Sequence, residues 1–93
     1  MSVVVQIPET LRDYCGCHDE LFVSAHDVGH ALKELQRTHP HVYQCVCDET
    51  GEVRRHIHLF VNNDLVAMQD RRGSQVRLNA GDILTIWTAV SGG

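Results

Sequence analysis

The chain has 93 residues and a formal net charge of −4, from 8 basic and 12 acidic side chains. Hydrophobic residues make up 43% and charged residues 22%, a balance typical of a globular domain, and residues 1–93 are expected to form a single one. The acidic balance argues against nucleic-acid binding, no apolar run approaches the roughly 20 residues that span a bilayer, and so small a core disfavours most enzymes.

The first residues predict a β-hairpin. Alternating β-branched residues from Val3 to Ile7 predict a strand, which Pro8 ends because proline cannot donate to a strand ladder. Residues 9–19 are polar and contain glycine, so they predict a turn or a wide loop. Glu20 to Ser24 then predicts a second short strand, antiparallel to the first.

A helix follows the hairpin. Ser24 to Asp27 matches the S-x-x-D signal for a helix start, with Asp27 in the first turn. Apolar residues then recur at the spacing of one helix face: Val28, Ala31, Leu32 and Leu35. Pro40 predicts that the helix ends near Thr38 or His39.

The rest of the chain predicts further strands. Residues 41–52 are ambiguous between a loop and a helical turn that caps the core. Val53 to Asn62 predicts a long strand, and a tight turn leads from it into Leu65–Met68. After a surface loop and residues 75–78, Ile83–Thr88 predicts the last strand.

The order β-β-α-β-β-β, with one main helix on one face of a mixed sheet, is an α+β arrangement in two layers. The first and last strands can pair in parallel at the centre of the sheet. That topology is the β-grasp, or ubiquitin-like, architecture.

Three stretches of the chain resemble the ubiquitin-like sulfur carriers of the MoaD/ThiS family. Residues 57–63 resemble the family's strand and turn of type I-x-V-N-x, and residues 81–86 resemble its G-D-x-(V/L)-x-I strand entry. The ending Ala-Val-Ser-Gly-Gly is close to the family's C-terminus, although Thr88 stands where many relatives have proline. The opening residues 3–12 are most similar to the CysO-like branch, which delivers sulfur for cysteine synthesis.

This resemblance implies a protein co-substrate and not an enzyme. The reacting group would be the C-terminal carboxylate of Gly93. An adenylating enzyme of the MoeB/ThiF type would activate it with ATP, and a sulfur donor or sulfurtransferase would convert it to a thiocarboxylate for a sulfur-accepting synthase. The chain itself would bind no cofactor, since the activating partner uses the ATP. The resemblance leaves open whether the sulfur reaches cysteine, molybdopterin, thiazole or a specialised metabolite.

The tail suits such chemistry for a steric reason. Gly92 and Gly93 lack Cβ atoms, so a flexible tail of residues 89–93 can thread a narrow channel and approach nucleotide phosphates closely. The sequence does not reveal whether residues that follow Gly93 are removed by a protease.

An exposed apolar patch is expected on the open face of the sheet. Alternation along the last strand turns Trp87 away from the helix, and alternation along its neighbour does the same for His58 and Phe60. By resemblance, family members use this surface, with Val90 of the tail, to dock the activating enzyme and the sulfur acceptor. Such patches are typical of protein interfaces.

The chain contains more cysteine and histidine than the family pattern requires. Two C-x-C pairs, Cys15/Cys17 and Cys45/Cys47, can bind a metal, form a disulfide, or serve as buried apolar residues and exposed thiols. Their spacing is poor for zinc. His26 and His30, at i and i+4 on the predicted helix, can share a metal but are expected on its solvent side without that role. No resident metal is therefore assigned.

The sequence also bears on the cellular location of the protein and on alternative functions. No basic start or long apolar stretch at the N-terminus indicates a secretory signal, so we expect a cytoplasmic location with reduced cysteines. The alternatives to a sulfur carrier are a ubiquitin-like modifier conjugated to lysines and a small metal-binding or scaffold module.

Overall fold

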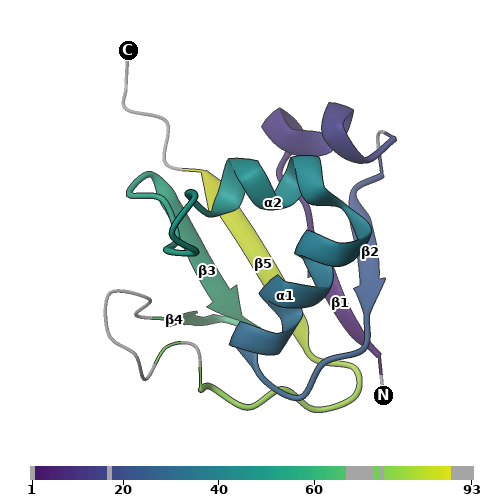
Figure 1. Cartoon of the computed structure of the whole chain (residues 1–93). Helices are drawn as coiled ribbons and strands as arrows, with labels where there is room; N and C mark the ends of the chain where they lie inside the picture. Colours follow the sequence, from purple (N-terminus) through teal and green to yellow (C-terminus); the bar gives the residue numbers. More distant parts are fainter. Residues whose placement is uncertain (1, 17, 67–72, 74, 89–93) are drawn as a thin grey trace.

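A computed structural model shows a five-stranded mixed sheet in the order β2-β1-β5-β3-β4, with helices packed on one face (Figure 1). It describes residues 2–16, 18–66, 73 and 75–88. The elements are β1 (Val3–Gln6), the 3-10 helix η1 (Glu9–Cys15), β2 (Glu20–Val23), α1 (Val28–Thr38), α2 (Pro40–Val46), β3 (Ile57–Val61), β4 (Asp64–Val66) and β5 (Ile83–Thr88). Strands β1 and β5 pair in parallel at the centre of the sheet. The α+β, β-grasp architecture expected from the sequence is confirmed.

The core lies between the sheet and the helices. Every second strand residue points to the helical side, so that Val3, Val5, Leu84 and Ile86 are at most 1% exposed. Helix α1 contributes the stripe predicted from its spacing: Val28, Ala31, Leu32 and Leu35. In the part of the chain that the structure describes, no helix is long and apolar enough to cross a membrane.

The start of α1 differs from the prediction. Asp27, and not Ser24, is the N-cap, because its carboxylate accepts the backbone N–H of His30 at 2.6 Å. Asp27 itself has extended backbone, with φ −153° and ψ 172°. The carbonyl of His26 accepts the N–H of Leu78 at 2.9 Å, and the N–H of Val28 donates to the carbonyl of Val76 at 3.0 Å. Residues 76–78 therefore hold the helix start in place, and residues 75–78 form no strand of the sheet.

The long strand predicted from Val53 is wrong at its beginning. Residues 40–46 form helix α2, with Pro40 in its first turn, where the missing N–H costs nothing. The chain then turns, and Val53 pairs with Cys47 while Arg54 donates its side-chain Nε–H to the carbonyl of Gln44 at 2.9 Å. Because these residues cap α2, strand β3 begins only at Ile57. Strand β4 occupies Asp64–Val66, and residues 67–68 lie outside the described residues.

Asn62 fastens the β3–β4 turn to the start of β5. Its backbone φ is +56°, in the left-handed region that asparagine tolerates better than most residues. The N–H of Ile83 donates to Asn62 Oδ1 at 3.2 Å, and the N–H of Asn62 donates to the carbonyl of Ile83 at 2.7 Å. Asn62 Nδ2 also lies 3.4 Å from Asp82 Oδ1, whose second oxygen accepts the N–H of Asn79 at 2.8 Å. The I-x-V-N and G-D motifs thus meet in one set of bonds, which we call the Asn62 clamp.

The Asn62 clamp gives a stability prediction with a matched control. Asn62→Gly keeps the left-handed turn and loses only the side-chain bonds, so it should lower the free energy of unfolding by about 1 kcal/mol. Asn62→Ala should lose about 2–3 kcal/mol, because alanine also resists positive φ. Asn63→Ala, one residue along the same turn, should stay within about 0.5 kcal/mol of wild type in urea denaturation. Wild-type stability for Asn62→Gly would contradict a role for the side chain.

Candidate functional site

Two aromatic side chains and one histidine gather on the open face of the sheet. Trp87 lies directly opposite His58 across the β5–β3 pair, with ring centroids 5.7 Å apart and planes inclined by 41°. Trp87 remains 53% exposed. On the same face Phe60 pairs with Thr85, one step further along the two strands. The structure therefore places these side chains where strand alternation predicts them.

Leu65 completes this surface, and sequence reasoning missed it. The two-residue turn at Asn62 and Asn63 brings Leu65 opposite Phe60, and Leu65 is 61% exposed. The signal was present, because a two-residue turn fixes the register of a hairpin. We call His58, Phe60, Leu65 and Trp87 the Trp87 patch. Beside it, a shallow open groove is lined by Phe60, Asn62, Asn63, Thr85 and Trp87.

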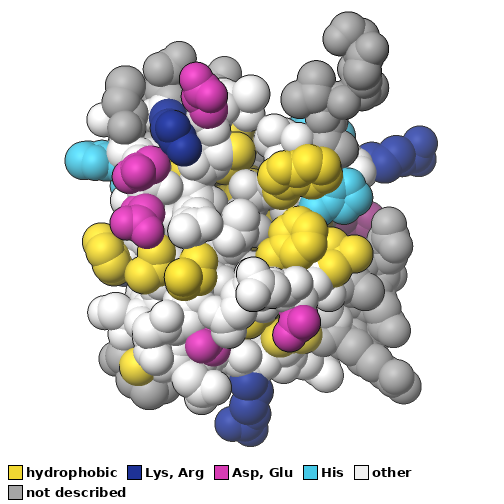
Figure 2. Space-filling view, turned by 180° about the vertical axis from the view of Figure 1, so that it is seen from behind, with side chains coloured by type: hydrophobic (Ala, Val, Ile, Leu, Met, Phe, Trp, Pro, Cys, Tyr) yellow, Lys and Arg dark blue, Asp and Glu magenta, His cyan; other side chains and the backbone are white. Residues whose placement is uncertain are grey.

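A second apolar strip lies on the other half of the same face. Phe22 pairs with Val4, and Val4 pairs with Ile83, which forms a row across three strands. Phe22 is 69% exposed. Figure 2 shows the two apolar groups as separate yellow areas on the side of the sheet away from the helices. Between them, Thr85 Oγ1 donates to Gln6 Oε1 at 3.1 Å, so a polar pair divides the face.

The tail begins where the Trp87 patch ends. Thr88, the last described residue, pairs with Ile57 across the β5–β3 ladder, and its hydroxyl lies 3.3 Å from that of Thr10 on η1. The predicted tail, with Val90, Gly92 and Gly93, lies outside the described residues. Gly93 follows Trp87 by six residues, a span of at most about 20 Å when fully extended. A protein that grips the patch and reacts with the terminal carboxylate must place the two sites within that distance.

The cysteines described by the structure have different surroundings. Cys47 is 1% exposed and forms part of the core, and burial raises the pKa of its thiol to about 11. Cys45 is partly buried, and both thiols are free. Cys17 and the side chain of Cys15 lie outside the described residues. A metal site or disulfide formed by the two C-x-C pairs therefore stays a prediction. Among the residues described, no group of three or more His, Cys, Asp or Glu side chains could hold a metal ion.

Comparison with solved structures identifies similar molecules. SAMP1 from Haloferax volcanii is 27% identical, with full coverage of both chains and a TM-score of 0.82. CysO in the BexX/CysO complex of Amycolatopsis orientalis is 27% identical over 98% of this chain and 99% of that one, with a TM-score of 0.84. CysO of Mycobacterium tuberculosis is 26% identical over 95% and 99% of the two chains, with a TM-score of 0.81.

These neighbours support the resemblance that the motifs indicate. The chain is similar over nearly its whole length to CysO and to SAMP1, both ubiquitin-like proteins of its own size, and the CysO-like expectation is confirmed. One of these neighbours was solved in a complex with another protein, BexX. No family model and no curated protein sequence matches the chain.

The buried thiol of Cys47 predicts a pH dependence of stability. A thiol that titrates at 9.0 when unfolded and at about 11 when folded favours the native state while it stays protonated. That contribution is complete below pH 9 and is lost as the pH rises through 11. Stability measured by urea denaturation should therefore fall across this range.

Two variants isolate this effect from other groups that titrate in the same range. Cys47→Ala should show a shallower decline than wild type, whatever its stability at neutral pH. Cys45→Ala, which removes the partly buried thiol two residues away, is the matched control. Equal slopes for all three proteins would show that Cys47 does not titrate with folding.

Proposed function

We propose that the chain is a sulfur carrier, a co-substrate that other enzymes act upon in the cytoplasm. One observation carries the proposal: the central strand β5 bears the exposed Trp87 and leads within six residues to a terminal Gly-Gly. The docking surface and the reacting group are thus two parts of one strand and its extension. The likeness to CysO in fold and length supports this reading.

The proposed chemistry takes place on the Gly93 carboxylate. Its oxygen attacks the α-phosphorus of ATP in the active site of an adenylating enzyme of the MoeB/ThiF type, and pyrophosphate leaves. A sulfur donor at the oxidation level of sulfide, supplied directly or by a sulfurtransferase, then attacks the acyl carbon and displaces AMP. The product is a thiocarboxylate, whose sulfur passes to a synthase that makes cysteine, molybdopterin, thiazole or another sulfur metabolite.

The folded part of the chain contributes docking and not catalysis in this proposal. The Trp87 patch combines a large exposed indole with Phe60 and Leu65, and aromatic residues of this kind dominate the binding energy of many interfaces. Its position next to Thr88 lets one partner hold the patch while the tail enters that partner's active site. Val90, between the two, is the further contact that we propose. The chain needs no bound cofactor for this role.

A second function shares the first chemical step. SAMP1, which matches the whole chain, is described as a small archaeal modifier protein. In that role the Gly93 acyl group would pass to the amine of a target lysine, with an isopeptide bond formed in place of the thiocarboxylate. The two functions therefore separate at the acceptor and not at the tail.

Mass spectrometry of the intact chain tests the proposal and distinguishes the alternative. After incubation with ATP, an adenylating enzyme and sulfide, the chain should gain the mass difference between one sulfur and one oxygen atom, located at Gly93. A chain without Gly92 and Gly93 should show no gain while it keeps the wild-type circular dichroism. Lysine-linked adducts in cells without any thiocarboxylate would support the modifier, and the absence of both products would refute the proposal.

The docking role of the Trp87 patch has its own test. Trp87→Ala should raise the Kd for the adenylating enzyme by about 30-fold, the effect of a 2 kcal/mol hot spot. Phe22→Ala removes a comparably exposed aromatic side chain from the far half of the same face and should raise Kd by less than about fivefold. Both variants should keep the wild-type melting temperature within a few degrees. Equal effects of the two substitutions on Kd would place the contact elsewhere.

A further inference from the structure

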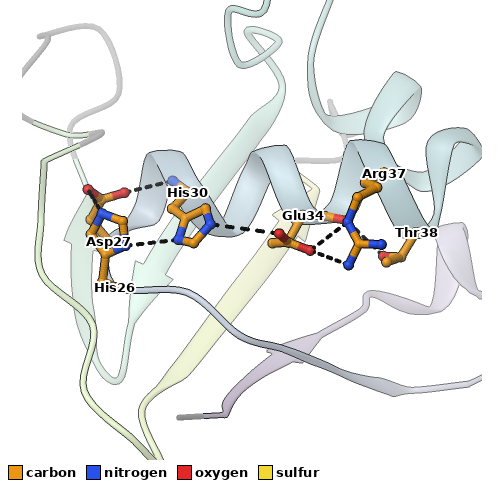
Figure 3. A network of polar contacts seen from close by, with 6 residues as sticks. All are labelled: His26, Asp27, His30, Glu34, Arg37 and Thr38. Atoms are coloured by element: carbon orange, nitrogen blue, oxygen red, sulfur yellow. Dashed lines mark hydrogen bonds and ion pairs between the residues drawn. The ribbon is translucent and has the colours of Figure 1, made fainter.

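We infer that His26 and His30 form a two-histidine chelate for a divalent transition-metal ion at the start of helix α1. Their Nδ1 atoms face each other at a distance of 2.9 Å, and their ring centroids are 4.5 Å apart. Figure 3 shows the two rings between the carboxylates of Asp27 and Glu34. The site lies in a cluster that the proposed sulfur-carrier function does not use.

The other nitrogens of the two rings decide where their protons reside. His26 Nε2 lies 3.3 Å from Asp27 Oδ2, and His30 Nε2 lies 3.7 Å from Glu34 Oε1. A carboxylate near Nε2 favours the tautomer that carries hydrogen there, as in the carboxylate–histidine pairs of metal sites. At 2.9 Å the two Nδ1 atoms share a hydrogen bond, in which one ring donates to the other. A metal ion bound to both nitrogens would take the place of that shared hydrogen.

Both carboxylates are held in place by structural bonds. Asp27 uses Oδ1 to cap α1 through the His30 N–H, which leaves Oδ2 for the His26 ring. Glu34 binds Arg37 through Oε2 at 2.7 and 3.0 Å, which leaves Oε1 for the His30 ring (Figure 3). Each acid therefore joins one imidazole to the helix. The two acids lie beside the Nε2 atoms of the rings, where metal sites place carboxylates that orient their histidine ligands.

The distance between the two Nδ1 atoms favours one class of metal ion. With metal–nitrogen bonds of about 2.0–2.1 Å, donors 2.9 Å apart subtend an angle of about 90° at the ion. This angle fits the cis positions of tetragonal Cu²⁺ and Ni²⁺ better than tetrahedral Zn²⁺. The side chains of His26 and His30 are 71% and 37% exposed, so water can fill the remaining positions. No third ligand joins them among the described residues, which makes the site an exchangeable one.

An ion at this position would also act on the fold. His26 precedes the N-cap Asp27, whereas His30 lies inside the first helical turn, so a bridging ion ties the incoming segment to the helix. Among the described residues, Arg37 binds Glu34, and the backbone of Arg77 pairs with that of Asp27. Because Glu34 accepts from Arg37, that guanidinium balances the charge of the acid.

Titration calorimetry with Ni²⁺ tests the inference, since Ni²⁺ does not oxidise the thiols. The wild-type chain should bind one equivalent at this site, and His26→Ala and His30→Ala should each raise the Kd at least about tenfold. The double variant should be scarcely worse than either single one, because a chelate needs both rings. His39→Ala/His41→Ala removes two histidines whose rings belong to no such pair and should leave the Kd unchanged. Circular dichroism verifies that each variant keeps its helices.

Two further readouts separate the chelate from thiol or scattered binding. Saturating Ni²⁺ should raise the melting temperature of wild type but not of His30→Ala, because the ion binds only the folded site. The inference is overturned if either single variant binds as wild type does, if His39→Ala/His41→Ala causes an equal loss, or if binding brings the near-ultraviolet absorption of a nickel thiolate.

Discussion

The register between β3 and β5 is the constraint on which the exposed surface depends. A slip of β3 by one residue against β5 would send Leu59 outward and bury His58, because side chains alternate between the two faces of a strand. The Asn62 clamp opposes that slip at one end of the strand pair, and the contact between Thr10 and Thr88 lies at the other. The composition of the Trp87 patch and the point at which the tail begins both follow from this register.

Sequence periodicity predicts the elements that pack against the core. It misses the segments that pair with a loop. The helical stripe from Val28 to Leu35 and the alternation through β5 are confirmed because burial decides them. Val53 to His56 has the composition of a strand, yet the carbonyls at the end of α2 attract its backbone and the side chain of Arg54. Ser24 matches a cap signal equally well, but pairing with residues 76–78 decides which residue caps α1. Such competition depends on segments far apart in the chain.

Some features of the candidate site can likewise be predicted from the sequence, and others need the structure. The terminal glycines and the outward direction of Trp87 can be read from order and alternation alone. The addition of Leu65 needs a register, and the separation of the Phe22 strip from the Trp87 patch needs the order of strands in the sheet. The arrangement of the histidine pair is the hardest to predict from the sequence. The spacing indicates a shared helix face, whereas the observed contact joins His26, before the N-cap, to His30 in the first turn of α1. Only the structure shows which ring nitrogens face each other.

The parallel pairing of β1 and β5 at the centre of the sheet has a consequence for synthesis of the protein. The first strand made must wait for nearly the last one before the two can pair, so the ladder cannot form while residues 83–88 are still inside the ribosome. A chain cut short before β5 lacks its middle strand and the two core residues that this strand supplies, Leu84 and Ile86. Premature termination before β5 should therefore leave a chain with an incomplete core.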